Sequence, residues 1–137
     1  MRTKIRPASS DDIESIVEIE NSTNLMPWTK AQFISSMEVG HYSTVLELAE
    51  TIIGFAIYSP IIPESHLLNI AIDPAYHRKG LGDKLLKQVI LQNKAVGVKV
   101  INLEVRVSNL VAINPVSYTH LRAHETLRYL VCRLLLE

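Results

Sequence analysis

The sequence predicts a mixed α/β domain, and three patterns along the chain lead to that class. Tyr42–Leu48 and Ile52–Ser59 are runs rich in β-branched and aromatic residues with a short link between them, which indicates a β-hairpin. Leu67–Ile72 is a run of strand length that is apolar apart from Asn69. Apolar residues from Leu81 to Ile90 recur at helical spacing, so a strand, a turn and a helix follow one another here.

Length and composition describe one folded domain. With 137 residues the chain has room for a single core, and 47% apolar against 20% charged residues is typical of a globular protein. Its 14 basic and 14 acidic residues cancel, so no overall field draws the chain to nucleic acid or to an acidic membrane surface. Any anion site must therefore be local.

Other residue types argue against further classes. No stretch approaches the roughly 20 apolar residues of a membrane span, and the first residues lack the apolar core of a secretion signal. The single cysteine, Cys132, excludes an intramolecular disulfide and fits a cytoplasmic protein. The five histidines show no metal-binding spacing, so we expect no metal.

The N-terminal residues predict a strand followed by a helix. Thr3–Arg6 is a short strand that Pro7 ends, and Ser9 or Ser10 caps the helix. We expect the helix to end near Asn21. The residues that set its spacing are Ile13, Ile16, Val17 and Glu20.

A second helix follows with a clear start signal. Thr29 and Gln32 have the spacing of a capping box, in which each side chain satisfies a backbone amide of the other residue. Trp28, just before the cap, is placed to pack on Phe33 as a hydrophobic staple. This helix should end before Gly40.

The predicted hairpin contains one unusual residue and is followed by a loop. Gly54 lies inside its second strand, which indicates a bulge or a close approach of another backbone. Pro60 and Pro63 bracket the loop that precedes the apolar strand.

Between the apolar strand and its helix lies a candidate anion site. Pro74 ends the strand, because proline has no amide hydrogen for the sheet. Arg78 and Lys79 then precede Gly80 and Gly82 at the predicted helix start. First-turn amides have no partner inside a helix, and glycines let a phosphate approach the backbone closely. The pattern therefore favours an anion cradle.

Two known phosphate loops are excluded. No Gly-Lys-Ser/Thr sequence occurs at Gly80, so the Walker motif is absent, and Leu85 stands where a dinucleotide fingerprint needs its third glycine. On spacing alone, an ordinary strand-to-helix turn is as good an interpretation as an anion site.

The next segment predicts a further strand and a helix. From Lys99 to Val107 the residues alternate between apolar and polar, with Glu104 on the polar side. Ser108 or Asn109 can cap a helix that begins near residue 110.

Three separated stretches have the residues of one known family. They read MPWTKAQF, LLNIAIDPAYHRKGLGDKLL and INLEVRVSNLVAIN. Together they resemble the GCN5-related N-acetyltransferase (GNAT) family, and within it the ribosomal-protein-alanine N-acetyltransferases, over residues 1–114. The resemblance implies an α+β fold with a mixed, mostly antiparallel sheet.

It also implies an activity. Such an enzyme transfers the acetyl group of acetyl-CoA to the N-terminal α-amine of an alanine on a ribosomal protein, in the cytoplasm, without metal, membrane or direct nucleic-acid contact. The alternatives are a non-catalytic coenzyme-binding domain and an inactive fragment of such an enzyme.

The resemblance assigns a coenzyme site. Ile70, Ala71 and Ile72 match the strand whose backbone pairs with the pantetheine arm and polarises the thioester carbonyl; as residues alone they form a core strand. The pyrophosphate loop corresponds to Arg78, Lys79, Gly80, Leu81, Gly82 and Asp83. Without the resemblance, its two basic residues are a solvated turn. His77 departs from the glutamine or arginine that usually begins this loop.

Three further residues carry roles by resemblance. Glu104 matches the general base, which the reaction needs because an α-amine attacks a thioester only after losing its proton; alternatively it forms an exposed strand pair with Arg106. Asn109 matches a coenzyme-contacting asparagine or is a helix cap. Trp28 matches the wall of the acceptor site or is only the staple described above.

After Asn114 the resemblance to the family stops. Val116 stands at the tyrosine that protonates the departing thiolate, and Tyr118 is two residues away from that position. The segment 115–137 is similar to translated sequencing-adapter DNA. We therefore expect an incomplete domain over 1–114, an atypical tail over 115–137, and an open sheet edge that a helix over Leu121–Leu136 would cover in part.

Overall fold

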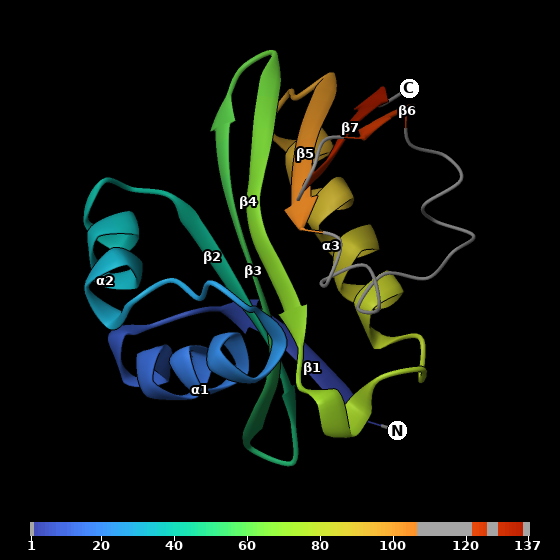
Figure 1. The fold of residues 1–137 in the computed structure, drawn as a ribbon. Helices are drawn as coiled ribbons and strands as arrows, with labels where there is room; N and C mark the ends of the chain where they lie inside the picture. Colours follow the sequence, from blue (N-terminus) through green and yellow to red (C-terminus); the bar gives the residue numbers. More distant parts are fainter. Residues whose placement is uncertain (1, 107–121, 126–128, 136–137) are drawn as a thin grey trace.

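The computed structural model describes residues 2–106, 122–125 and 129–135, and it confirms a mixed α/β domain (Figure 1). Within these ranges no helix combines the length and the apolar character needed to cross a membrane. The elements are β1 (Thr3–Pro7), a 3-10 turn (Ser10–Asp12), α1 (Ile13–Thr23), α2 (Lys30–Glu38), β2 (Tyr42–Leu48), β3 (Thr51–Ile61), β4 (Glu64–Ile72), a second 3-10 turn (Pro74–Tyr76), α3 (Leu81–Ala95), β5 (Val100–Arg106), β6 (Arg122–Glu125) and β7 (Tyr129–Leu135).

The strands form one sheet in the order β1-β2-β3-β4-β5-β7-β6. Among the described strands, neighbours are antiparallel except for the parallel pair β4 and β5. The sheet is therefore mixed and mostly antiparallel, as predicted. Because β4 and β5 run the same way, α3 crosses between them on one face of the sheet (Figure 1).

The expected open edge and the expected helix in the tail were both wrong. β7 pairs antiparallel with β5 along its whole length, from Val100 opposite Leu135 to Arg106 opposite Tyr129. β6 then pairs with β7. The unpaired backbone groups of β5 explain this, because a strand edge offers hydrogen bonds to any extended segment that reaches it.

Helices cover both faces of the sheet. α1 and α2 lie on one face and α3 on the other (Figure 1). Side chains alternate along each strand, so the strands supply two separate clusters of buried residues. The cluster under α1 and α2 includes Ile16, Ile19, Phe33, Phe55 and Ala71. The cluster under α3 includes Ile53, Ile70, Ile72, Leu85 and Val89.

The start signal of α2 is confirmed in detail. Thr29 Oγ1 accepts a hydrogen bond from the Gln32 amide (3.2 Å), and Gln32 Oε1 accepts one from the Thr29 amide (2.7 Å). The ring centroids of Trp28 and Phe33 are 5.2 Å apart, which confirms the staple. α1 ends at Thr23, two residues later than predicted.

The proline-bracketed loop was predicted too long. β3 continues to Ile61 and β4 begins at Glu64, with Pro60 opposite Ser65. The pairing of β2 with β3 stops at Tyr58, so the described part of β3 beyond this residue has β4 as its strand neighbour. A proline is tolerated here because one side of the strand needs no amide hydrogen.

Gly54 combines both features expected of it. A register shift lies directly beside it, and a Cβ at this position would be 2.5 Å from Ile72 Cδ1 and 3.1 Å from the Ala71 carbonyl oxygen. We predict that Gly54→Val lowers the free energy of unfolding by about 1–3 kcal/mol through overpacking. Urea unfolding measures the change, with Thr51→Val at the exposed start of β3 as control. Equal midpoints for the two variants would contradict the close approach.

An ion pair fixes the entry into α1. Arg6 donates to both oxygens of Asp12, at 2.8 and 2.9 Å, and Asp12 also accepts from the Ser9 amide at 2.8 Å. The hydrogen bonds from Arg6 hold the pKa of the Asp12 carboxyl below its ordinary value. A carboxyl with a lowered pKa stabilises the fold above its unfolded pKa, and this contribution is lost as the pH falls through the folded value.

We therefore predict a pH-dependent effect of Asp12→Asn. The loss of stability relative to the wild type is greatest near neutral pH and shrinks as the pH falls below about 4. Urea unfolding at a series of pH values measures it, with the exposed Asp11→Asn as control. A difference between wild type and Asp12→Asn that stays constant down to about pH 2 would show that the charge of Asp12 is not responsible.

Candidate active site

The two parallel strands separate at the centre of the sheet. β4 pairs with β5 only from Glu64 opposite Val100 to Leu67 opposite Leu103. β4 then continues to Ile72 and β5 to Arg106 without further pairing between them. Beyond Leu67, no described strand pairs with this side of β4. We call the opening between β4 beyond Leu67 and β5 beyond Leu103 the fork. It leaves backbone groups of β4 available to another partner.

The predicted strand residues use their backbones in two ways. The Asp73 amide donates to the Ile53 carbonyl on β3 at 2.7 Å, which places the backbone groups of Asp73 on the β3 side. Backbone direction alternates along a strand, so Ile72 and Ile70 face the fork, while Ala71 faces β3 opposite Phe55. All three predicted side chains, Ile70, Ala71 and Ile72, are buried in the core.

The turn after β4 folds back onto the end of the strand. The Asp73 side chain accepts a hydrogen bond from the Ala75 amide at 2.9 Å and so begins the short 3-10 turn. His77 Nε2 lies 2.6 Å from the Ile72 carbonyl oxygen. Because a carbonyl oxygen only accepts, Nε2 carries the hydrogen in this contact. His77 thus ties the turn to the edge of β4 that faces the fork.

The turn places glycine where the backbone needs it. Gly80 is the N-cap of α3 and has a φ of +75°, in the left-handed region. The first bond across the N-terminus of α3 runs from the Lys84 amide to the Gly80 carbonyl (3.1 Å). The amides of Leu81, Gly82 and Asp83 therefore have no partner inside the helix, and the helix dipole favours an anion beside them.

The charges around this turn are arranged for an anion. Arg78, Lys79 and Gly80 are exposed beside the start of α3. The one acidic side chain in the first turn, Asp83, has its Oδ2 paired with Lys87 Nζ at 2.9 Å. The backbone amides and two basic side chains can thus hold a diphosphate, with Asp83 contributing only its amide.

Glu104 lies at the fork itself. It is the residue of β5 directly after the last pair with β4, and its backbone is opposite Val131 of β7. Asn109 lies outside the described residues. The structure therefore gathers the strand residues 70–72 and the turn residues 78–83 at one end of β4, with the backbone of Glu104 at the base of the same opening.

Two residues that organise this region were not assigned a role from the sequence. His77 was noted only as a departure from the family pattern, and Glu20 only as a helix-spacing residue. Glu20 is fully buried on α1 and accepts a hydrogen bond from the Asn69 side chain of β4 at 2.9 Å. A signal for Glu20 was present, because an acidic residue occupied an otherwise apolar position in the helical repeat.

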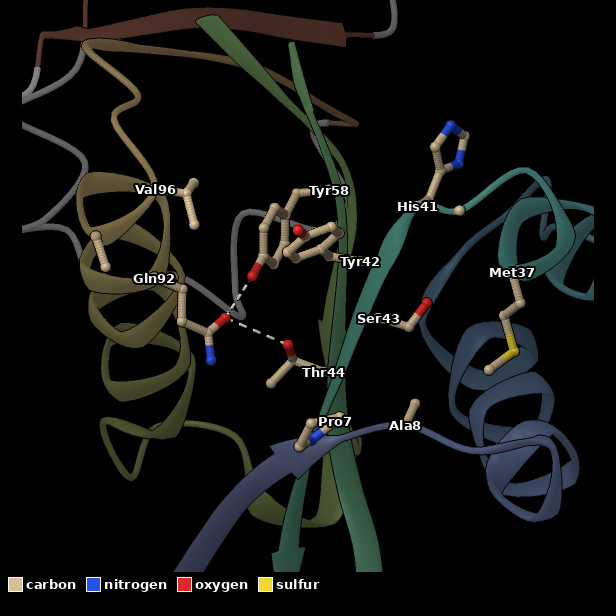
Figure 2. A pocket seen from close by; sticks show the side chains of 12 residues that line it. Pro7, Ala8, Met37, His41, Tyr42, Ser43, Thr44, Tyr58, Gln92 and Val96 are labelled. Carbon is tan, nitrogen blue, oxygen red and sulfur yellow. Dashed lines mark hydrogen bonds between the residues drawn. The ribbon is translucent and has the colours of Figure 1, made fainter. Parts of the chain in front are cut away.

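The larger of the two described cavities is elsewhere. It has a volume of about 700 Å³ and lies between the C-terminal half of α3 and the start of β2 (Figure 2). Gln92 Oε1 there accepts hydrogen bonds from the hydroxyls of Tyr58 at 2.6 Å and Thr44 at 3.4 Å. Burial raises the pKa of the Tyr58 hydroxyl. None of the predicted site residues is among the described residues that line this cavity.

Metal ligation finds no support in the described ranges. No three side chains of His, Cys, Asp or Glu come close enough there to hold a metal ion.

A forked parallel pair with a glycine turn at the start of the crossing helix fits an acyl-coenzyme A site, and comparison with known proteins defines the class. The model of the Acetyltransferase (GNAT) family matches residues 13–114. The chain belongs to this acetyltransferase family, as the sequence motifs indicated.

Within this family, the chain is similar to two proteins with a named acceptor. The chain is 35% identical over 101 residues to the "[Ribosomal protein bS18]-alanine N-acetyltransferase" of Haemophilus ducreyi, covering 74% of this chain and 70% of that protein. It is also similar to the crystal structure of the ribosomal-protein-S18-alanine N-acetyltransferase from Escherichia coli, with 28% identity and a TM-score of 0.84 over 98% of this chain and 94% of that chain.

A third comparison supports the fold alone. The PaiA N-acetyltransferase of Thermoplasma acidophilum, solved in complex with coenzyme A, is 18% identical, with a TM-score of 0.83 over 99% of this chain and all of that chain (100%).

The left-handed conformation of Gly80 leads to a prediction about the stability of the fold. No atom lies within 4 Å of a Cβ built on Gly80, so a side chain there costs only the left-handed backbone strain. We expect Gly80→Ala to lower the free energy of unfolding by about 1–2 kcal/mol, and Gly80→Asn by less, because asparagine tolerates this conformation. Urea unfolding of both variants is the measurement. An alanine variant as stable as the wild type would contradict the assigned conformation.

Proposed function

We propose that this chain transfers the acetyl group of acetyl-CoA to the N-terminal α-amine of a ribosomal protein, with alanine as the acceptor residue. The observation that carries the proposal is the fork between β4 and β5 together with the glycine-capped start of α3, which follows β4 after a short turn. Family membership supports the reaction class, and the names of the two bS18 and S18 relatives support the acceptor. From a ribosomal acceptor we infer that the reaction takes place in the cytoplasm.

The residues present fit acetyl-CoA. The unpaired first-turn amides of α3, with Arg78 and Lys79 beside them, suit the pyrophosphate. The backbone of Ile70 faces the fork, where an amide-containing arm can pair with it as a strand does. When bound, acetyl-CoA supplies an activated thioester.

The chain's own residues then have two tasks. Glu104, at the base of the fork, takes the proton from the acceptor's α-ammonium group, directly or through water, so that the amine can attack the thioester carbonyl. The C–N bond forms as the C–S bond breaks, and the thiolate that leaves takes a proton from water. An amide of β4 that faces the fork donates to the carbonyl oxygen on which negative charge develops. Apolar side chains on both faces of β4 hold these amides in place.

A non-catalytic coenzyme-binding domain is the second candidate, because Val116 replaces the acid tyrosine of the family pattern. Binding and turnover separate the two. An acetyltransferase binds acetyl-CoA and acetylates a peptide that begins with alanine, whereas a non-catalytic domain binds acetyl-CoA without acetylating the peptide.

We predict that Glu104→Gln lowers kcat for an alanine-started peptide by about 10²-fold or more while leaving the Kd for acetyl-CoA unchanged. Steady-state acetylation assays give kcat, and calorimetric titration gives Kd. Glu38→Gln, at the exposed C-terminal end of α2, is the matched control. Full activity in the Glu104 variant would remove this residue as the base. Absence of coenzyme binding by the folded wild type would overturn the proposed function.

A further inference from the structure

The carboxylate of Glu20 joins three separate segments. Its side chain is 0% exposed, and Oε2 accepts hydrogen bonds from Asn69 Nδ2 at 2.9 Å, the Trp28 amide at 3.0 Å and Asn24 Nδ2 at 3.4 Å. Asn69 belongs to β4, Trp28 and Asn24 belong to the connection between α1 and α2, and Glu20 itself is on α1. A single oxygen atom thus fixes the connection 24–29 against the strand.

Fold stability alone does not explain this choice of residue. A fully buried carboxylate costs several kcal/mol of desolvation unless hydrogen bonds compensate, and a well-packed apolar side chain is often at least as stable. Glu20 Oε1 is also buried, and it has no hydrogen-bond partner within the described chain. Burying the Glu20 carboxylate therefore costs free energy, and in return its hydrogen bonds give the segments that it joins a defined position.

The segment that Glu20 holds presents an apolar surface beside the fork. Leu25 is 89% exposed and Met26 57% exposed, and the half-buried Trp28 follows after Pro27. The strand residue at the other end of the contact, Asn69, directly precedes Ile70, whose backbone faces the fork. The connection between α1 and α2 passes beside this part of β4 (Figure 1).

We propose that Glu20 is a positioning residue for the acceptor peptide. By tying residues 24–29 to Asn69, it sets the distance between the surface that receives the peptide and the strand that receives the thioester. It does not act on the substrates itself, because no part of its side chain is exposed. This inference rests on the proposed acetyl transfer to a protein N-terminus.

The test uses Glu20→Gln, with Glu18→Gln on the exposed side of α1 as matched control. The glutamine keeps an acceptor for the three donors but loses the charge that strengthens those bonds. We expect KM for the alanine-started peptide to rise about tenfold, since small displacements at a reacting site have large effects, while the Kd for acetyl-CoA stays within about twofold. A rise of both constants by one factor would overturn the proposal, because it would indicate general damage to the fold.

A second measurement needs no activity. Trp28 is the only tryptophan of the chain, so its fluorescence reports on the held segment. Acrylamide should quench Trp28 more strongly in folded Glu20→Gln than in the wild type or in Glu18→Gln. The variant Asn69→Ser, which removes one donor, should show a smaller change in the same direction and serves in place of Glu20→Gln if that variant does not fold.

The two proposals fail separately. A wild type that binds acetyl-CoA but acetylates no peptide would overturn the proposed function, while the quenching difference would still show whether Glu20 holds the segment. Equal quenching in folded wild type, Glu20→Gln and Asn69→Ser would overturn the positioning role.

Discussion

Pairing between β4 and β5 ends at Leu67 and Leu103, and the rest of the site depends on how the chain treats the backbone beyond this pair. Buried amide and carbonyl groups need hydrogen-bond partners, so a strand with one free side is held open only if something else can occupy that side. Helices on both faces bury the side chains of β4 and keep it extended. The opening therefore belongs to the framework of the domain and is not a local loop conformation.

The second constraint is the way in which the chain leaves β4. Asp73 begins a short turn, His77 returns to the Ile72 carbonyl, and Gly80 takes the left-handed conformation that starts α3. Each step is short-range, and together they bring unpaired helix amides to the end of the strand that borders the fork. An anionic group and an extended amide-containing arm can then be held by adjacent parts of one strand-turn-helix unit.

Short-range patterns were read correctly from the sequence. The Thr29 and Gln32 cap, the packing of Trp28 on Phe33 and the glycine at the start of α3 depend only on residues a few positions apart. Features that depend on residues far apart in the chain could not be predicted from the sequence. Glu20 meets Asn69 across 49 positions, and the tail forms strands because β5 offers it an edge. Pro60 is tolerated because the pairing of β3 with β2 stops at Tyr58. The catalytic role of Glu104 and the coenzyme contact of Asn109 remain predictions.

The four residues from Asn69 to Ile72 serve three neighbours at once. The Asn69 side chain contacts Glu20 of α1, and the side chains of Ile70 and Ile72 pack under α3. The backbone groups of Ile70 and Ile72 face the fork. A substitution here changes the packing of the core and, under the proposed function, the sites of both substrates, so this strand has little freedom to vary. The side chains of Leu25 and Met26, by contrast, are exposed. Divergence toward other acceptors within this architecture would therefore accumulate in the connection between α1 and α2, while the strand stays fixed.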